Sequence, residues 1–450
     1  MQSEKKENQF CTFNPSRRRF INTLGTLAAS SFLIPRFSHA DKKHTLRILQ
    51  WNHFVPEFDH WFDNTFIKNW SDEHDTEVII DRVGMTSLNS RANAEISRGS
   101  GHDLFMFLRP PSTYEDQVID HKEIYEECSR RYGKPNDIAI KSTYNPKTNK
   151  YFGFSDSYVP DPVNYRTDLW DDVGVSPDSW DNIRRGGSEI FKRHGIPIGL
   201  GLAPELDSNM ALRSLLHSFG ASVQSKDGIP ILHSKQTLDA LKFAKALFQD
   251  AMTEEVLAWD PSSNNRMMLA GNGSLTLNAI SITRTGETQK IPLADKISLA
   301  PAAAGPARRI GLIHLMHVYT IWKFAQNIDG AKQFLVDYLG QFRSAFMASK
   351  FYNFPCFPDT VPDIAQLIAD DPTATPRDKY SILADVQDWT TALGYPGFAN
   401  AVEDETFSNW VISDMFATAA RGKATPEEAM KTANAKVRAI HNKWLQQGKV

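Results

Sequence analysis

Aromatic and hydrogen-bonding residues gather at five places along the sequence, each at the predicted end of a strand or at a turn: residues 51–53, 158–161, 205–209, 259–260 with 264–265, and 352–354. Of the two kinds, residues 205–209 contribute only hydrogen-bonding side chains, and the other four places combine both. Aromatic faces stack on the apolar faces of sugar rings, while carboxylate, amide and guanidinium groups bond the hydroxyls. For any single cluster, an ordinary packed loop explains the pattern equally well. Together, the clusters predict a site that holds a polar small molecule between aromatic side chains.

Signatures of catalysis are missing from the sequence. No GxSxG, HExxH, GxxxxGK or GxGxxG pattern occurs. His314 and His317 are three residues apart, but Leu315 and Met316 between them favour a strand, which indicates core or site histidines rather than a metal pair. Spacing fixes no pair of carboxylates for acid–base chemistry. We therefore predict no enzyme activity, no catalytic residue, no cofactor and no metal site.

Composition narrows the class of protein further. The chain has 450 residues, of which 41% are apolar, and a formal net charge of −3. These values exclude a disordered, collagenous or integral membrane protein, and the balanced charge argues against a nucleic-acid binder. At this length two large lobes are expected rather than one core. Without a CxxC motif there is no zinc framework, and geometry must decide whether Cys128 and Cys356 pair.

The first 40 residues are predicted to be an export signal rather than part of the fold. Residues 16–21 read Ser-Arg-Arg-Arg-Phe-Ile, a twin-arginine pattern, and the mildly apolar stretch 21–34 is too short to cross a bilayer. Ser38 and Ala40 are the small residues expected before cleavage after about Ala40. A basic amphipathic first helix is the alternative. Removal of this segment, which carries a net charge of +4, leaves 410 residues with −7, and we predict a periplasmic location.

The beginning of the expected mature chain alternates between strand and helix patterns: strand 45–51, helix 54–70, strand 76–83, helix 87–98 and strand 103–108. The last strand is almost continuously apolar, as strands buried on both faces are. This order is typical of a parallel α/β layout, in which ligands bind at the carboxyl ends of the strands. Residues 51–53 and 108–111 lie at those ends.

Further along the chain the same alternation continues less regularly. A helix is predicted from Trp180 to about 194 with Asp178 or Ser179 as N-cap, and later elements are predicted as strand 196–202, helices 209–219 and 236–252, and strand 275–277. Residues 425–429, Thr-Pro-Glu-Glu-Ala, predict the start of the last helix, because threonine caps, proline suits the first turn and acids face the positive end of the helix dipole.

Several of these elements occur in the order and spacing of a known family. They are the opening strand–helix–strand of residues 46–83, the Gly-Ser-Gly-His-Asp of 99–103 before an apolar strand, the Asn-Tyr-Arg-Thr-Asp-Leu-Trp of 164–170 with Gly174, Pro177 and Trp180, and the Gly-Lys-Ala-Thr-Pro-Glu-Glu-Ala of 422–429. Behind an export signal, they make the chain resemble the extracellular solute-binding proteins of ABC importers, carbohydrate-binding group (family 1). Arg166 and Ser179 depart from the family pattern, in which asparagine and threonine are usual.

The resemblance implies an α/β fold of two lobes, each a mainly parallel sheet flanked by helices, with the ligand cleft at the hinge. The expected divisions are a signal over 1–40, an N-terminal lobe of 41–158 plus 316–355, and a C-terminal lobe of 159–315 plus 356–450. The implied function is that of the substrate-binding component of an ABC importer. It would capture a sugar, polyol or related carbohydrate in the periplasm and deliver it, as a monomer, to a permease at the inner membrane, without contacting nucleic acid.

Residue by residue, the resemblance and the strand ends together predict ten ligand-binding residues. They lie after the predicted strands, at the crossings between lobes and in the loops of the second lobe: Trp51, His53, Arg109, Tyr158, Asp161, Glu205, Asp207, Asn209, Asn278 and Tyr352. The loop at Asn278 lacks the stacking aromatic that the family often has there.

Two other functions remain open from the sequence. One is an exported, cofactor- or metal-dependent periplasmic enzyme acting on a polar small molecule, which would explain the twin-arginine signal. The other is a sensor that presents its ligand to a receptor. The charge of the ligand is also open, since Arg109 would suit an anion and Asp161, Glu205 and Asp207 a neutral or cationic molecule.

Overall fold

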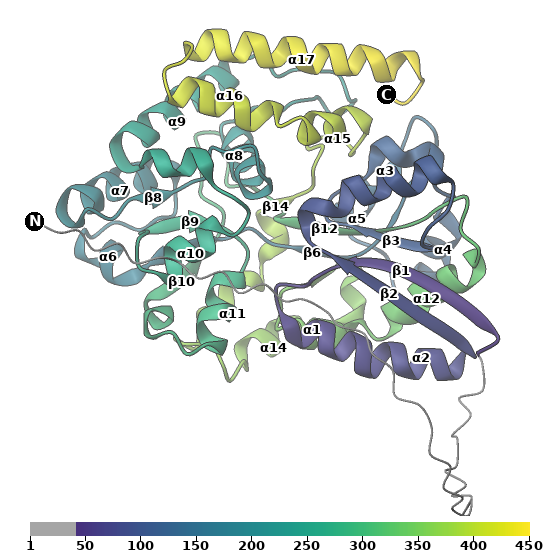
Figure 1. The fold of residues 1–450 in the computed structure, drawn as a ribbon. Coiled ribbons are helices and arrows are strands. Elements are labelled where there is room, and N and C mark those ends of the chain that lie inside the picture. Colours follow the sequence, from purple (N-terminus) through teal and green to yellow (C-terminus); the bar gives the residue numbers. More distant parts are fainter. Residues whose placement is uncertain (1–41) are drawn as a thin grey trace, which may run out of the picture. The chain divides into compact units, whose positions relative to one another are not determined.

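A computed structural model describes residues 42–450; the predicted export signal lies outside these described residues. The described chain contains two main sheets, each with its own apolar core (Figure 1). The first sheet has the order β13-β6-β12-β3-β1-β2, and its strands in chain order are β1 (His44–Trp51), β2 (Thr76–Val83), β3 (Leu104–Phe107), β6 (Phe154–Val159), β12 (Leu315–Ile321) and β13 (Phe354–Pro355).

The second sheet is smaller and has the order β10-β7-β9-β8. Its strands are β7 (Val163–Arg166), β8 (Ile198–Gly199), β9 (Leu275–Leu277) and β10 (Ile297–Ala300). Two short pairs add to these sheets: β4 (Tyr144–Asn145) with β5 (Lys150–Tyr151), and β11 (Gly311–Leu312) with β14 (Thr390–Thr391). This arrangement confirms the predicted two-lobe α/β architecture.

The directions of neighbouring strands correct the expectation of mainly parallel sheets. In the first sheet β1 pairs in parallel with β2 and β3, but β12 is antiparallel to both β3 and β6, and β13 is antiparallel to β6. In the second sheet only β8 and β9 pair in parallel. The reason is that β7 and β12 enter their sheets from the other lobe and therefore run against the strands that point towards the hinge.

Helices flank both sheets. Those packed around the first sheet are α1 (Pro56–Trp61), α2 (Lys68–Glu73), α3 (Leu88–Arg98), α4 (Lys122–Tyr132), α5 (Asp137–Thr143), α12 (Ile328–Gly340) and α13 (Phe342–Ala348). A π-helical segment, Phe62–Ile67, joins α1 to α2, so the single helix predicted over 54–70 is continuous but locally widened. Figure 1 shows α3 and the α1–α2 helix on opposite sides of this sheet.

The helices of the second lobe and the C-terminal region complete the fold. They are α6 (Thr167–Asp172), α7 (Trp180–His194), α8 (Leu206–Ser218), α9 (Lys235–Ala251), α10 (Ser263–Leu269), α11 (Ser281–Thr288), α14 (Ile364–Ala369), α15 (Ala401–Ser408), α16 (Val411–Ala420) and α17 (Pro426–Gln446). Of the two candidates for the cap of α7, Ser179 is the N-cap, since its side chain accepts from the backbone N–H of Asn182. Helices α8, α9, α16 and α17 pack together (Figure 1).

Both cysteines in the described residues are buried and free, so Cys128 and Cys356 do not pair. Within residues 42–450 no helix combines the length and apolar character needed to cross a membrane.

The start of α17 gives a prediction about stability. Thr425 accepts from the backbone N–H of Glu428, whose carboxylate accepts from the N–H of Thr425 in return, which forms a reciprocal capping box. Replacing Thr425 with alanine removes this cap and should lower the free energy of unfolding by about 1 kcal/mol. Denaturant unfolding measures the loss. Thr425→Ser, which keeps the hydroxyl, is the control, and equal losses in both variants would contradict a role for the hydroxyl.

Candidate ligand-binding cleft

The strands bring several predicted site residues to the region where the two sheets meet. Trp51 ends β1, Arg109 follows β3 by two residues and Asn278 directly follows β9. The chain passes from β6 to β7 through Asp161 between two prolines, and it returns to β12 through His314. The two crossing segments therefore lie at the same end of the sheets as the strand termini.

A groove with a volume of about 360 Å³ opens between the lobes. It is bordered on one side by the end of β3 and the start of α3, and on the other by the loops before α8 and α10, with the α15–α16 junction closing it. Its charged and aromatic lining residues include Arg109, Glu205, Trp259, Asp260, Phe407 and Trp410. We name this space the interlobe groove. Trp410 has a φ of 56°, a left-handed conformation that is rare for a bulky residue.

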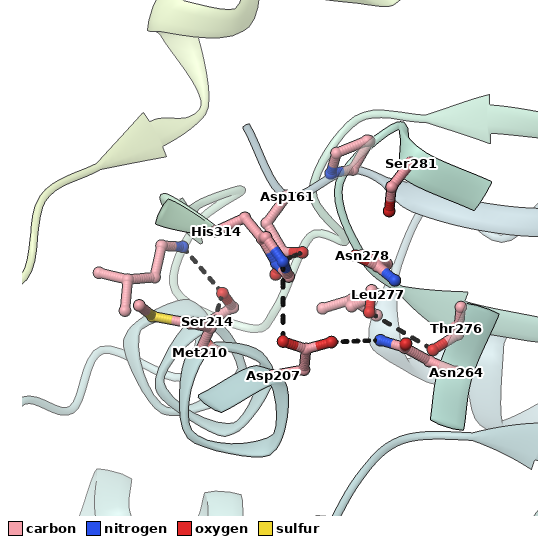
Figure 2. Close-up of polar contacts among 12 residues, drawn as sticks. Asp161, Asp207, Met210, Ser214, Asn264, Thr276, Leu277, Asn278, Ser281 and His314 are labelled. Atoms are coloured by element: carbon pink, nitrogen blue, oxygen red, sulfur yellow. Dashed lines mark hydrogen bonds and ion pairs between the residues drawn. The ribbon is translucent and has the colours of Figure 1, made fainter. Parts of the chain in front are cut away.

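Beside the groove, three buried ionisable residues form a chain of contacts that we name the hinge triad. His314 Nδ1 lies 3.2 Å from Asp161 Oδ1, and His314 Nε2 lies 3.7 Å from Asp207 Oδ1. Asn264 donates to the other carboxylate oxygen of Asp207 at 2.7 Å. Figure 2 shows His314 between the two aspartates, with Asn264 on the far side of Asp207. The triad thus connects both crossing segments to the first turn of α8.

The two aspartates of the hinge triad favour the protonated form of its histidine, His314. Burial would lower the pKa of His314, but the charges of Asp207 and Asp161 outweigh burial and raise it. Burial raises the pKa of Asp161, and the hydrogen bond from His314 opposes that rise. Burial, together with repulsion by the carboxylate of Asp207, also raises the pKa of Glu205. The side chain of Glu205 caps α8 by accepting from the N–H groups of Asp207 and Ser208. Burial likewise raises the pKa of Asp207, to about 6. The region therefore gathers acidic groups whose protonated form burial favours.

On the first lobe, aromatic and polar side chains contact one another near the ends of β1, β12 and the start of β13; we name His53, His317, Tyr352 and Asn353 the deep cluster. The ring of His53 lies 5.2 Å from that of Tyr352 and 6.3 Å from that of His317, and Trp51 lies 5.9 Å from His317. The N–H of Val55 donates to His53 Nδ1, so Nε2 carries the proton and donates to Asn353 Oδ1 at 3.0 Å.

Arg109 is held by α15. Its guanidinium donates to Ser408 at 2.6 Å, lies 3.0 Å from Asp404 and stands over the ring of Phe407. Glu403, the residue of α15 directly before Asp404, pairs with Arg213 of the second lobe at 2.7 Å. Consecutive acids of α15 thus bind opposite sides of the interlobe groove, and the positive charge of Arg109 is already neutralised.

The remaining predicted residues are buried near these groups without joining either cluster. Tyr158 lies in β6, where its ring packs near Phe354 at 6.0 Å. Asn209 donates to the carbonyl of Phe407, and Asn278 donates to Asn265, which itself donates to Ser281. The structure therefore brings together His53, Tyr352, Asp161 and Asp207, places Arg109 and Glu205 at the groove, and sets Trp51, Tyr158, Asn209 and Asn278 around them.

The fold of this chain is shared with several solved structures. Maltose-bound MalE3 of Thermotoga maritima aligns with a TM-score of 0.72 at 17% identity over 88% of this chain and 99% of its own. A sugar transporter protein of Arthrobacter chlorophenolicus with bound laminaribiose gives 0.72 at 14% over 88% and 99%, and an ABC transporter solute-binding protein of Agrobacterium radiobacter with ribitol gives 0.69 at 13% over 89% and 99%. This chain has the two-lobe periplasmic-binding-protein fold.

The sequence of the chain is only distantly similar to those of known proteins. No family model matches the chain. Curated proteins of Brucella abortus and Brucella suis, named as candidate binding proteins without a ligand, are 23% identical over 283 residues. The alignment covers 62% of this chain and 65% of the length of those relatives, slightly less than two thirds.

Some cleft residues of this periplasmic-binding-protein fold were not among the predicted site residues. Trp259 and Asn264 stand in one of the alternating aromatic and polar clusters, so a signal for them existed, and the sequence left His314 between a core and a site role. Trp410 and Asp404 gave no signal, because they follow the last predicted cluster by 50 residues or more and reach the cleft only through the packing of α15. Within residues 42–450 no group of three or more histidine, cysteine or acidic side chains is arranged to hold a metal ion.

The buried His53 gives a prediction about pH. Burial lowers its pKa to about 4, against an ordinary value of 6.5. A neutral buried histidine stabilises the fold fully above pH 6.5, and this contribution is lost as the pH falls towards 4, by about 1.4 kcal/mol per pH unit. His53→Gln should therefore reduce the slope of unfolding free energy against pH between 6.5 and 4 by about 1.4 kcal/mol per pH unit, while the buried His121 and His217, whose pKa values are also lowered to about 4, keep their own contributions. Denaturant unfolding across this range tests it, with His60→Gln on the surface of α1 as control. An unchanged slope in His53→Gln would contradict the assignment.

Proposed function

We propose that this protein is the substrate-binding component of an ABC importer that captures a sugar, polyol or related carbohydrate in the periplasm. It would deliver this ligand unchanged to a permease at the inner membrane. The fold supports the proposal, because two lobes joined by crossing segments can close over a ligand by hinge motion. The solved structures of this fold named above hold maltose, laminaribiose and ribitol.

The observation that carries the proposal is the composition of the cleft. Glu205 lines the interlobe groove together with the aromatic side chains of Trp259, Phe407 and Trp410. Asp207, two residues after Glu205, belongs with Asp161 to the hinge triad. Aromatic faces and hydroxyl-bonding carboxylates are the two kinds of group that a sugar or polyol needs. Ligand binding would act by shifting the population from an open to a closed form.

The proposal includes the organisation predicted from the sequence. Residues 1–40 would be a twin-arginine signal cleaved after about Ala40, and the protein would work as a monomer. The lobes would comprise 41–158 plus 316–355 and 159–315 plus 356–450. The ten predicted residues, from Trp51 to Tyr352, would line or support the cleft. We propose no chemical step, and the exported-enzyme alternative is not favoured by the proteins that share the fold.

A thermal-shift screen tests the function. Maltose, laminaribiose, D-tagatose, ribitol, amino acids and polyamines would each be added to the purified protein. A ligand at 100 times its Kd adds about 2.7 kcal/mol, which corresponds to a rise of several degrees in Tm. A rise with one sugar or polyol is the expected result. A rise only with amino acids or polyamines, or conversion of the added compound, would contradict the proposal.

A further inference from the structure

Four buried polar atoms on β12, before β13 and in the crossing from β6 to β7 have no hydrogen-bond partner within the described residues. They are Asp161 Oδ2, His317 Nε2, the hydroxyl of Tyr352 and Asn353 Nδ2. Their side chains belong to residues that are at most 2% exposed. Leaving a buried polar group without a partner costs about 1–3 kcal/mol, so each of these atoms would gain from a hydrogen bond to a ligand.

These four atoms belong to residues grouped around His53 and Tyr352. His53 touches Asn353 through its hydrogen bond and faces the rings of both His317 and Tyr352. Tyr352 in turn feels the charges of Asp207 and Asp161, which, after burial, raise the pKa of its hydroxyl. Tyr352 also precedes β13, and β13 pairs with the end of β6, directly before the crossing segment that contains Asp161.

Neighbouring bonds fix which of these atoms donate and which accept. Asn353 uses its oxygen to accept from His53, so its free Nδ2 is a donor. Ser157 donates to Asp156 and therefore accepts from His317 Nδ1, which leaves Nε2 as an acceptor. Asp161 Oδ2 accepts, and the hydroxyl of Tyr352 can do both. This mixture of donors and acceptors matches hydroxyl groups, which also do both, better than phosphate or carboxylate, which only accept.

The charges around the deep cluster also disfavour an anion. Asp161 and Asp207 are acidic groups, and the only basic side chain of the hinge triad, His314, lies between them and is bonded to Asp161. The arginine that lines the groove, Arg109, is neutralised by Asp404. An anionic ligand group would thus meet carboxylates without an unpaired cation, and burying an unpaired charge is costly.

We propose that the deep cluster, with Asp161, binds an uncharged, hydroxyl-bearing end of the ligand, and that the protein discriminates against phosphorylated and carboxylated counterparts of the same ligand. This inference rests on the proposed function, and it settles the ligand charge that the sequence left open. The specificity-determining atoms are the four unpartnered ones. A phosphate or carboxylate on a modified sugar would meet the acidic groups of the hinge triad without an unpaired cation.

Calorimetric titration with matched pairs tests the discrimination. The pairs are ribitol and ribitol 5-phosphate, D-tagatose and D-tagatose 6-phosphate, and maltose and maltobionate. We expect at least one neutral member to bind and its charged counterpart to bind at least 100-fold more weakly. Equal or tighter binding of a charged member would overturn the inference while leaving the proposed function standing. Absence of binding by every member would overturn the proposed function and this inference with it.

A second measurement separates ligand contact from a structural role. Tyr352→Phe removes only the unpartnered hydroxyl, so it should leave Tm unchanged or slightly higher. It should nevertheless weaken binding of the neutral ligand about threefold to tenfold. Tyr125→Phe is the matched control: Tyr125 is a buried tyrosine of the same lobe whose hydroxyl bonds Thr143 and whose ring packs on Tyr151. It should lower Tm and leave affinity unchanged. Wild-type affinity in Tyr352→Phe would overturn the role of this hydroxyl.

Discussion

Replacing Arg213 with methionine should lower the free energy of unfolding by about 3–5 kcal/mol. Arg213 lies on α8 and pairs with Glu403 of α15 at 2.7 Å, and both side chains are 1% exposed. Methionine fills similar space but leaves the carboxylate of Glu403 buried without a counter-charge, which is the costly arrangement. Equilibrium unfolding in denaturant measures the loss.

Two further variants identify the cause of this loss. The double variant Arg213→Met with Glu403→Leu removes both charges and should recover most of the lost stability, because a buried pair replaced by apolar residues is often neutral. Lys235→Met, which breaks the surface pair with Asp239 on α9, should have no measurable effect. If Arg213→Met were as mild as Lys235→Met, the pair would not be buried as described.

Replacing Asp161 with asparagine should weaken binding of the neutral ligand by about 10- to 150-fold. A hydrogen bond to a charged group contributes about 1.5–3 kcal/mol, which corresponds to this range in Kd. Asparagine keeps the shape of Asp161 but removes its charge, which loosens the contact with His314 and weakens the acceptor at Oδ2. Calorimetric titration with the neutral ligand identified by the matched pairs measures the change.

Asp103 provides the control for Asp161→Asn. It is also a buried aspartate, but it stands at the beginning of β3, away from the cleft, and accepts from the backbone N–H groups of Arg47, Gln326 and Asn327. Asp103→Asn should lower stability without changing affinity. An Asp161→Asn protein that binds like wild type would show that this carboxylate does not contact the ligand.

The first lobe could be predicted closely because its signals are local. Strand β2 matches the predicted 76–83 and β1 differs from the predicted 45–51 by one residue, since apolar and β-branched residues there fix the strands. The capping signals of α7 and α17 likewise depend on residues within one helical turn. Strand 196–202 was predicted too long; only Ile198–Gly199 pairs, because β9 offers just three residues.

Local sequence signals could not predict the strand directions or the cleft residues that come from distant parts of the chain. The position of β12 between β3 and β6 depends on a return of the chain across about 150 residues, which no local pattern records. The same holds for Asp404 and Trp410, which reach the cleft through α15. The unpartnered atoms of His317 and Asn353 depend on the hydrogen bonds that Ser157 and His53 make to these side chains, and no sequence pattern records those bonds.

A calorimetric titration of the purified protein with the neutral members of the matched pairs, followed by chromatographic recovery of the bound compound, tests the central claim most directly. We predict saturable binding at one site per chain, with the sugar or polyol recovered chemically unchanged. Recovery of a converted product would show an enzyme, and the absence of saturable heat with every neutral member would show that the cleft does not bind carbohydrate.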